Sequence, residues 1–108
     1  MTWKIEYYSD TVQREILALP SRLLARYIHL TDRMIDFGPN LGTPHTRSMD
    51  KGLFELRIKA AEGIARVFYF VRTGQRIVML HQYVKKSQKT PSKELKIARR
   101  RMKELKND

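Results

Sequence analysis

Residues 53–84 form the stretch LFELRIKAAEGIARVFYFVRTGQRIVMLHQYV, and this stretch decides the fold. Three runs rich in β-branched and aromatic residues lie within it, at 53–60, 64–71 and 76–84. Such runs are typical of strands, and the short gap between each pair contains a glycine. Connections this short join only antiparallel neighbours. The stretch therefore predicts a three-stranded antiparallel meander.

The first turn fixes an approximate strand register. If residues 61–62 form its centre, positions whose numbers sum to 123 lie opposite each other. Arg57 then lies directly against Arg66, on the sheet face opposite to the apolar Phe54 and Leu56. Like charges in directly opposed positions are destabilising. The register therefore marks a place where a bound phosphate would neutralise the two arginines.

The second turn extends this arrangement to the third strand. A turn centred on residues 73–74 puts Arg66 opposite His81, so that Arg57, Arg66 and His81 form a row across one sheet face. The same arithmetic places Met79 and Ile77 opposite Phe68 and Phe70. Tyr83, Lys85 and Lys86 would stand near one end of the row. Clustered charges of one sign favour an anion site.

Two helices are predicted before the meander. Residues 2–8 alternate as a strand does, and Ser9 can cap a helix whose face carries Val12, Ile16 and Leu19. After Pro20-Ser21, apolar residues recur at helical spacing, at Leu24, Tyr27, Ile28, Thr31, Met34 and Ile35. This second helix should end at residues 37–39, Phe-Gly-Pro. The two helices are expected to form an antiparallel hairpin.

The remaining segments complete an α+β fold of order β-α-α-β-β-β-α in one domain, 1–108. Residues 38–51 are predicted to be a loop, and Thr90-Pro91 a helix start with Thr90 as cap. The terminal helix is basic, with a narrow apolar stripe at Leu95, Ala98, Met102 and Leu105. The small sheet would be packed by the helical hairpin. Either the terminal helix or a partner would cover an apolar strip at Leu53, Phe68, Phe70, Ile77 and Met79.

Composition indicates a polyanionic partner. The chain has 22 Lys and Arg against 11 Asp and Glu, a formal charge of +11, and such an excess is the usual mark of nucleic-acid binding. It has no Cys, no apolar run near the roughly 18 residues of a membrane span, and no signal-like start. These features favour a cytoplasmic protein without a membrane partner. The three histidines are too scattered for metal-ligand spacing, and no glycine loop for phosphate occurs, so no cofactor is indicated.

Two segments carry a family resemblance. KGLFELR at 51–57, followed by RVFYF at 66–70, resembles the central strands of HigB-like toxins in the RelE superfamily. LHQYVKKSQKTP at 80–91 resembles a basic segment of the same branch. The resemblance implies a type II toxin that enters the ribosomal A site, contacts 16S rRNA and cuts mRNA there without metal. It also implies a HigA-like helix-turn-helix antitoxin, through which alone operator DNA would be bound.

The resemblance also suggests roles for individual residues. Arg57 and Arg66 match basic strand positions of the family and could stabilise the charge of a phosphorane formed by 2′-OH attack, which leaves a cyclic phosphate. Lys85, Lys86 or His81 could be the general base, because RelE carries a tyrosine beyond the basic pair and residues 87–92 contain none. Tyr83 could stack on an mRNA base. Other substrate-binding candidates are Lys59, Lys89, Arg99 and Arg100, and a patch around Arg22 and Arg26 could grip ribosomal RNA.

Other interpretations stay open at this point. A ParE-like toxin has the same fold, inhibits gyrase and cuts nothing. A non-catalytic protein that binds RNA or the ribosome needs only the basic charge. Alternatively, Arg57 and Arg66 lie in solvent and pair with Glu55 and Glu62.

Overall fold

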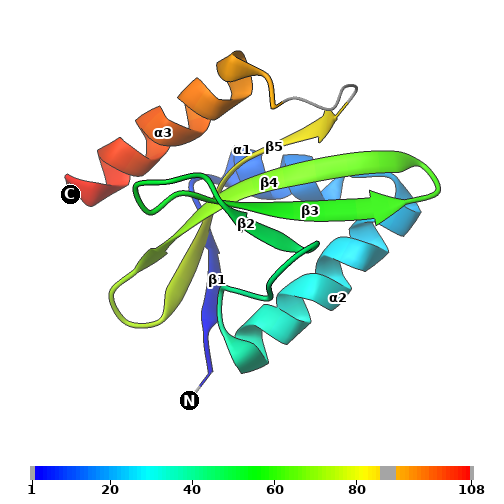
Figure 1. Cartoon of the computed structure of the whole chain (residues 1–108), viewed down its shortest axis with the longest axis horizontal. Coiled ribbons are helices and arrows are strands. Elements are labelled where there is room, and N and C mark those ends of the chain that lie inside the picture. The colour runs from blue at the N-terminus through cyan, green and yellow to red at the C-terminus, as the bar shows by residue number, and fades with distance from the viewer. Residues whose placement is uncertain (1, 86–89, 108) are drawn as a thin grey trace.

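The computed structural model describes residues 2–85 and 90–107. Its helices and strands follow in the order β1 (Lys4–Tyr7), α1 (Asp10–Leu17), α2 (Ser21–Phe37), β2 (Thr46–Ser48), β3 (Phe54–Ala60), β4 (Gly63–Arg72), β5 (Arg76–Lys85) and α3 (Ser92–Lys106). The sheet lies between α3 on one side and α2 on the other (Figure 1). Within the described ranges, no helix combines the length and the apolar character that crossing a bilayer requires.

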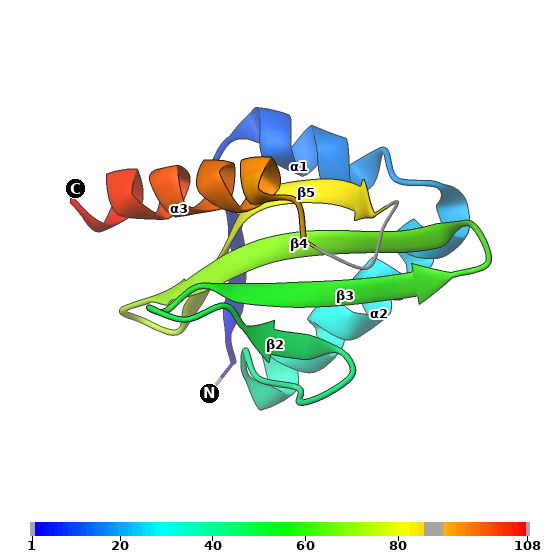
Figure 2. The same ribbon diagram turned by 45° about the horizontal axis from the view of Figure 1, so that its top comes forward.

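The sheet is mixed rather than wholly antiparallel. Its order is β1-β5-β4-β3-β2, and the predicted meander of β3, β4 and β5 forms its antiparallel centre. At one edge β1 pairs in parallel with β5, the last strand of the chain. At the other edge β2 pairs with β3 in antiparallel fashion, so the prediction of an unbroken loop over 38–51 is wrong. Figure 2 shows β2 as a short strand beside β3.

The register of the first hairpin is confirmed, and that of the second is corrected. Arg57 lies opposite Arg66 and Phe54 opposite Tyr69, as the sum of 123 predicts. In the second hairpin Arg66 lies opposite Tyr83 rather than His81. His81 instead lies opposite Phe68.

A β-bulge causes the difference. Phe68 pairs with His81 and Tyr69 pairs with Met79, which leaves Leu80 as an extra residue in β5. An extra residue reverses the alternation of side chains beyond it. Ile77 and Met79 therefore belong to the core under the N-terminal helices and not to the predicted apolar strip. Beyond the bulge, Tyr83 and Lys85 are brought to the sheet face of Arg66.

The two N-terminal helices form where the sequence predicts them, and both pack on the sheet, with a small rotation of α2. Ser9 caps α1 by accepting a hydrogen bond from the Val12 amide at 3.2 Å, and α2 ends at Gly38. The buried face of α2 consists of Leu23, Tyr27, Leu30, Thr31 and Met34. Leu24 and Ile35 are only partly buried and Ile28 is 47% exposed, because the residues next to them form the face that packs on the sheet.

Helix α3 covers the opposite face of the sheet. Ala98 and Met102 pack there with Leu53, Phe68 and Phe70, so this part of the predicted apolar strip is covered by the terminal helix. The predicted capping role of Thr90 is wrong: Pro91 takes the cap position and no side chain caps the helix. The Thr90 hydroxyl donates instead to Glu55 Oε2 at 3.3 Å.

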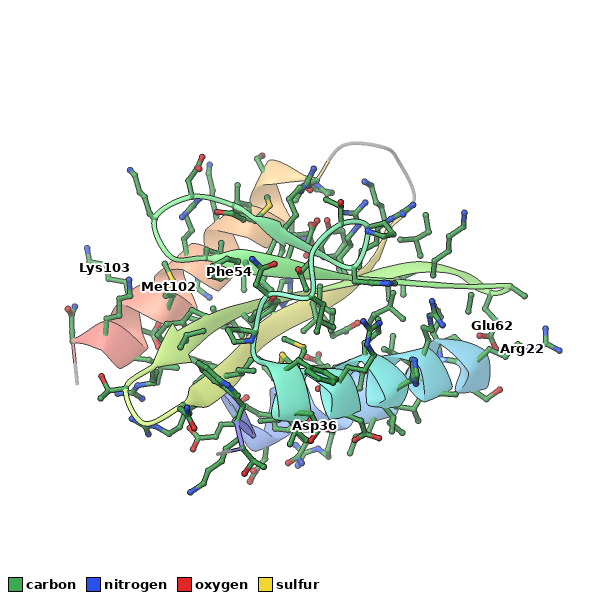
Figure 3. All side chains as sticks on the ribbon, turned by 60° about the horizontal axis from the view of Figure 1, so that its bottom comes forward. Arg22, Asp36, Phe54, Glu62, Met102 and Lys103 are labelled. Carbon is green, nitrogen blue, oxygen red and sulfur yellow. The ribbon has the colours of Figure 1, made fainter. Side chains whose placement is uncertain are left out.

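The β3–β4 turn caps α2 from across the chain. Glu62 accepts hydrogen bonds from the backbone amides of Arg22 and Leu23, at 3.3 and 2.9 Å. A carboxylate in this position satisfies amides at the helix N-terminus that would otherwise lack partners. Figure 3 shows Glu62 and Arg22 together at one end of α2, with Asp36 at the other end.

Candidate nucleic-acid cleavage site

Strands β2 to β5 surround a hollow of about 370 Å³, here called the arginine hollow. Its lining residues are Thr43, Pro44, Thr46, Arg47, Glu55, Arg57, Arg66 and Lys85. They come from the loop before β2 and from all four strands, so the pairing of the sheet determines their positions. Four cationic side chains and one carboxylate leave a formal charge of +3 in a concave surface (4 − 1). Concave surfaces with excess charge of one sign attract counter-ions strongly.

Arg66 is the most enclosed cation of the arginine hollow. Its side chain is 8% exposed, and its NH1 donates to Glu55 Oε1. Glu55 is 1% exposed and also accepts a hydrogen bond from Arg47 NH2 at 3.1 Å. Arg66 Nε is buried and has no hydrogen-bond partner within the described residues. Glu55 thus fixes one edge of the guanidinium group, and the protein encloses Nε without giving it an acceptor.

Arg57 lies directly opposite Arg66 and is half-buried. Within the described residues it has no ion pair, so the interpretation that both arginines pair with glutamates holds only for Arg66. Glu62, the other proposed partner, is bound to the amides of α2. The two arginines therefore face each other with only Glu55 to offset their charge. An oxyanion with two or three free oxygens is the kind of ligand that such a pair binds.

Lys85 contributes the third strand's cation to the hollow. Burial lowers the pKa of its ammonium group, and the positive charge of Arg66 lowers it further, with smaller contributions from Arg47 and Arg57. Glu55 acts in the opposite direction on the same pKa without cancelling the effect. Because its pKa is lowered, Lys85 loses its proton more readily than an ordinary lysine does, and a proton acceptor must be neutral.

His81 and Tyr83 do not line the arginine hollow. His81 Nε2 lies 3.1 Å from Glu94 Oε1, and Arg101 NH1 approaches its Nδ1 at 3.5 Å, so α3 holds the imidazole on both sides. Tyr83 is 8% exposed and stacks on Phe68 with ring centroids 5.8 Å apart. Burial raises the pKa of its hydroxyl. A ring this enclosed has no free face for a nucleotide base.

The remaining candidates fall in three places. Lys59 lies beside α2, in a second depression with Arg26. Arg99 donates to the carbonyls of Met49 and Asp50, which ties α3 to the β2–β3 loop. Arg100 is exposed on α3, 3.9 Å from Glu104. Lys86 and Lys89 lie outside the described residues.

Sequence reasoning missed Arg47 as part of the hollow. Its position depends on the three-residue strand β2, which places Arg47 opposite Glu55. A polar run of three residues in a loop rich in Gly and Pro gives no periodic signal for a strand. An arginine across from a buried glutamate is visible only once that pairing is known.

The chain is similar to known proteins in sequence and in fold. The family model described as "Phage derived protein Gp49-like (DUF891)" matches residues 14–103. The crystal structure of the archaeal RelE-RelB complex from Pyrococcus horikoshii OT3 contains a chain of similar fold, with a TM-score of 0.57 and 19% sequence identity. That match covers 78% of this chain and 96% of the other. No curated protein matches.

Proposed function

The chain belongs to the family of phage-derived Gp49-like proteins, and from this membership we propose that it is a RelE-type toxin that cleaves mRNA on the ribosome. The mixed α+β fold with three helices and a five-stranded sheet is similar to the RelE fold, which supports the assignment. The HigB-like branch is the finer assignment, supported by the segment at 80–91.

The observation that carries the proposal is the pairing of Arg57 with Arg66 in a concave surface of net positive charge. A sheet that only needed to fold would gain stability by separating these charges. A protein that only bound RNA would be served by exposed cations, whereas Arg66 is buried and oriented by Glu55. Burial and orientation are what preorganised donors for a developing charge require.

The proposed chemistry uses the 2′-OH of the mRNA as internal nucleophile. The 2′ oxygen forms a bond to the adjacent phosphorus and the bond from phosphorus to the 5′ oxygen breaks. The departing 5′ oxygen takes a proton from water, so the products are a 2′,3′-cyclic phosphate and a 5′-OH. Arg57 and Arg66 donate hydrogen bonds to the non-bridging oxygens as they gain charge. Lys85 accepts the proton of the 2′-OH, because it lines the hollow and its pKa is lowered, whereas α3 holds His81. No step in this scheme uses a metal ion.

The proposed partners follow from the same assignment. The archaeal RelE of similar fold occurs in a complex with RelB, so a proteinaceous antitoxin is proposed here, of the helix-turn-helix HigA type if the HigB-like branch applies. The ribosome, with 16S rRNA and mRNA in the A site, would supply the substrate. Operator DNA would be contacted through the antitoxin alone.

Primer extension on a reporter mRNA in a translating extract tests the function. Wild-type protein is expected to give new in-frame cuts that require ribosomes, and Arg57→Met is expected to give almost none. Cuts on ribosome-free RNA would retain the nuclease and remove the ribosome from the proposal. Intact mRNA together with inhibited DNA supercoiling by gyrase would replace it with the ParE-like function.

The lowered pKa of Lys85 leads to a pH prediction. A general base must be neutral, so the rate of single-turnover cleavage should rise with pH while Lys85 is mostly protonated and level off once it is mostly neutral. The midpoint of this rise should lie below the ordinary lysine pKa of 10.5. Lys85→Arg keeps the charge but stays protonated, so its rate should be low and flat with pH. His81→Gln should keep the wild-type profile. A rising profile in Lys85→Arg, together with a flat one in His81→Gln, would transfer the role to His81.

A further inference from the structure

Among the described residues, Glu55 is the one acidic side chain that lines the arginine hollow, and the proposed chemistry gives it no step. Glu55 lies on β3, opposite Arg47 on β2 and Phe68 on β4. Its side chain is 1% exposed, so it belongs to the floor of the hollow. A carboxylate this enclosed acts on a substrate only through the groups that it binds.

The carboxylate of Glu55 binds side chains from three segments of the chain. Its Oε1 accepts hydrogen bonds from Arg66 NH1 on β4 and from Arg47 NH2 on β2, the latter at 3.1 Å. Its Oε2 accepts a hydrogen bond from the hydroxyl of Thr90, which lies just before α3, at 3.3 Å. Two guanidinium groups that share one acceptor oxygen are held close to each other. Glu55 therefore joins β2, β4 and the approach to α3 at one point.

Stability alone does not call for a carboxylate at this position. Removing an ion from water costs several kcal/mol, and well-packed apolar side chains in place of a buried ion pair are often as stable or more so. Leu53, on the same face of β3, is fully buried and packs with Phe68, so an apolar side chain suits these surroundings. A carboxylate adds direction, because charge-assisted hydrogen bonds orient the donors. The position of Glu55 therefore favours a role in arranging the site.

Glu55 also acts on the cation that β5 contributes to the hollow. Burial and the positive charges of Arg66, Arg47 and Arg57 lower the pKa of Lys85, whereas the negative charge of Glu55 raises it. Loss of the Glu55 charge would therefore lower the pKa of Lys85 further. The titration of Lys85 thus reports on Glu55 independently of any cleavage.

We infer that Glu55 is a positioning residue of the cleavage site, which acts on the reaction through the side chains that it binds and without touching the substrate. Those side chains are Arg47, Arg66 and Thr90. The inference rests on the proposed function for the reaction that is positioned. It adds Arg47 and Thr90 to the site as groups whose places depend on one carboxylate. Such placement matters because a displacement of about 1 Å can cost about 100-fold in rate.

Single-turnover cleavage over a range of pH, with two variants of Glu55, tests the inference. Glu55→Asp keeps the charge but withdraws the carboxylate by one methylene, so the plateau rate should fall about tenfold or more while the midpoint stays. Glu55→Gln keeps the size and removes the charge. Its plateau rate should also fall, and its midpoint should move to lower pH, because the charge that raises the Lys85 pKa is gone. A merely structural residue would change the folded fraction, measured by circular dichroism, without moving the midpoint.

Two further variants complete the test. Glu94→Gln also removes an enclosed carboxylate from an ion pair, the one with His81, but Glu94 lies outside the hollow and does not influence Lys85. It should keep the wild-type plateau and midpoint. Thr90→Val removes the donor to Oε2 and leaves the ion pairs of Glu55 intact, so the plateau rate should fall about two- to tenfold. This variant tests the inference even where Glu55→Gln does not fold.

The outcomes separate the inference from the proposed function. Wild-type plateau rates in both Glu55→Asp and Thr90→Val would overturn the inference. A flat pH profile in Glu55→Gln would make Glu55 the proton acceptor, which overturns it as well. An NMR titration of isotope-labelled Lys85 needs no RNA, and an identical midpoint in wild type and Glu55→Gln would overturn the inference alone. Absence of cleavage by the wild type would overturn the proposed function itself.

Discussion

Replacing Arg66 with methionine is expected to reduce ribosome-dependent cleavage by at least about 100-fold and to destabilise the fold. Arg66 forms an ion pair with Glu55, and both side chains are buried. Loss of Arg66 leaves the buried carboxylate with only the exposed Arg47 as an ion-pair partner, and breaking a buried ion pair costs about 3 kcal/mol. In a domain of this size that corresponds to a drop in Tm of about 10 °C or more. Thermal unfolding and primer extension measure the two effects.

A double variant separates the structural role of Arg66 from its role toward substrate. In R66M/E55Q no buried charge is left without its partner, because Arg47, which also pairs with Glu55, is 56% exposed. The amide that replaces the Glu55 carboxylate can still accept hydrogen bonds from Arg47 and Thr90. Most of the lost stability should return, whereas cleavage should stay absent because the donor to phosphate is still missing. Recovery of cleavage together with stability would contradict contact between Arg66 and substrate and reduce its role to holding the sheet together.

Arg57→Met is expected to lose about 100-fold in cleavage with no loss of stability. Arg57 has no ion pair within the described residues and lies directly opposite Arg66, so its removal relieves a repulsion of like charges. The free energy of unfolding should stay the same or rise by a few tenths of a kcal/mol. The lost activity reflects the loss of one preorganised donor to the phosphorane.

The same sheet offers a matched control for Arg57→Met. Arg72 and Arg76 also lie directly opposite each other, at the β4–β5 turn, and line no part of the arginine hollow. Arg72→Met therefore removes a like-charge pair without touching the proposed site. It should leave cleavage intact, and a similar activity loss in both variants would show that total charge, and not position, determines activity.

The pairing at the centre of the site could be predicted from the sequence because a short turn and a period of two determine it. Ala61 to Gly63 allow little freedom, so Arg57 opposite Arg66 follows from counting. The two N-terminal helices could also be predicted, since Ser9 and Gly38 are strong end signals. These features depend on residues that are near each other in the chain.

What could not be predicted depends on contacts between distant segments. The strand β2 exists because β3 offers an unpaired edge, and its three residues carry no pattern of their own. The sequence predicts Thr90 as the cap of α3, but a buried carboxylate on β3 is a stronger partner for its hydroxyl than the amides of its own helix. The bulge at Leu80 likewise leaves no mark on an apolar run in which either register buries similar side chains.

The extra residue at Leu80 separates two sets of selective constraints along one strand. Before it, Ile77 and Met79 are held by the core beneath the N-terminal helices, whereas Tyr83 and Lys85, beyond it, belong to the face that carries the arginines. Substitutions on the two sides can therefore accumulate independently in related lineages. Loss of a single codon at position 80 has a different consequence, because it would turn Lys85 to the opposite face while leaving every residue of the hollow unchanged in identity. Chain length between β4 and Lys85 is thus expected to vary less among relatives than the amino acids themselves.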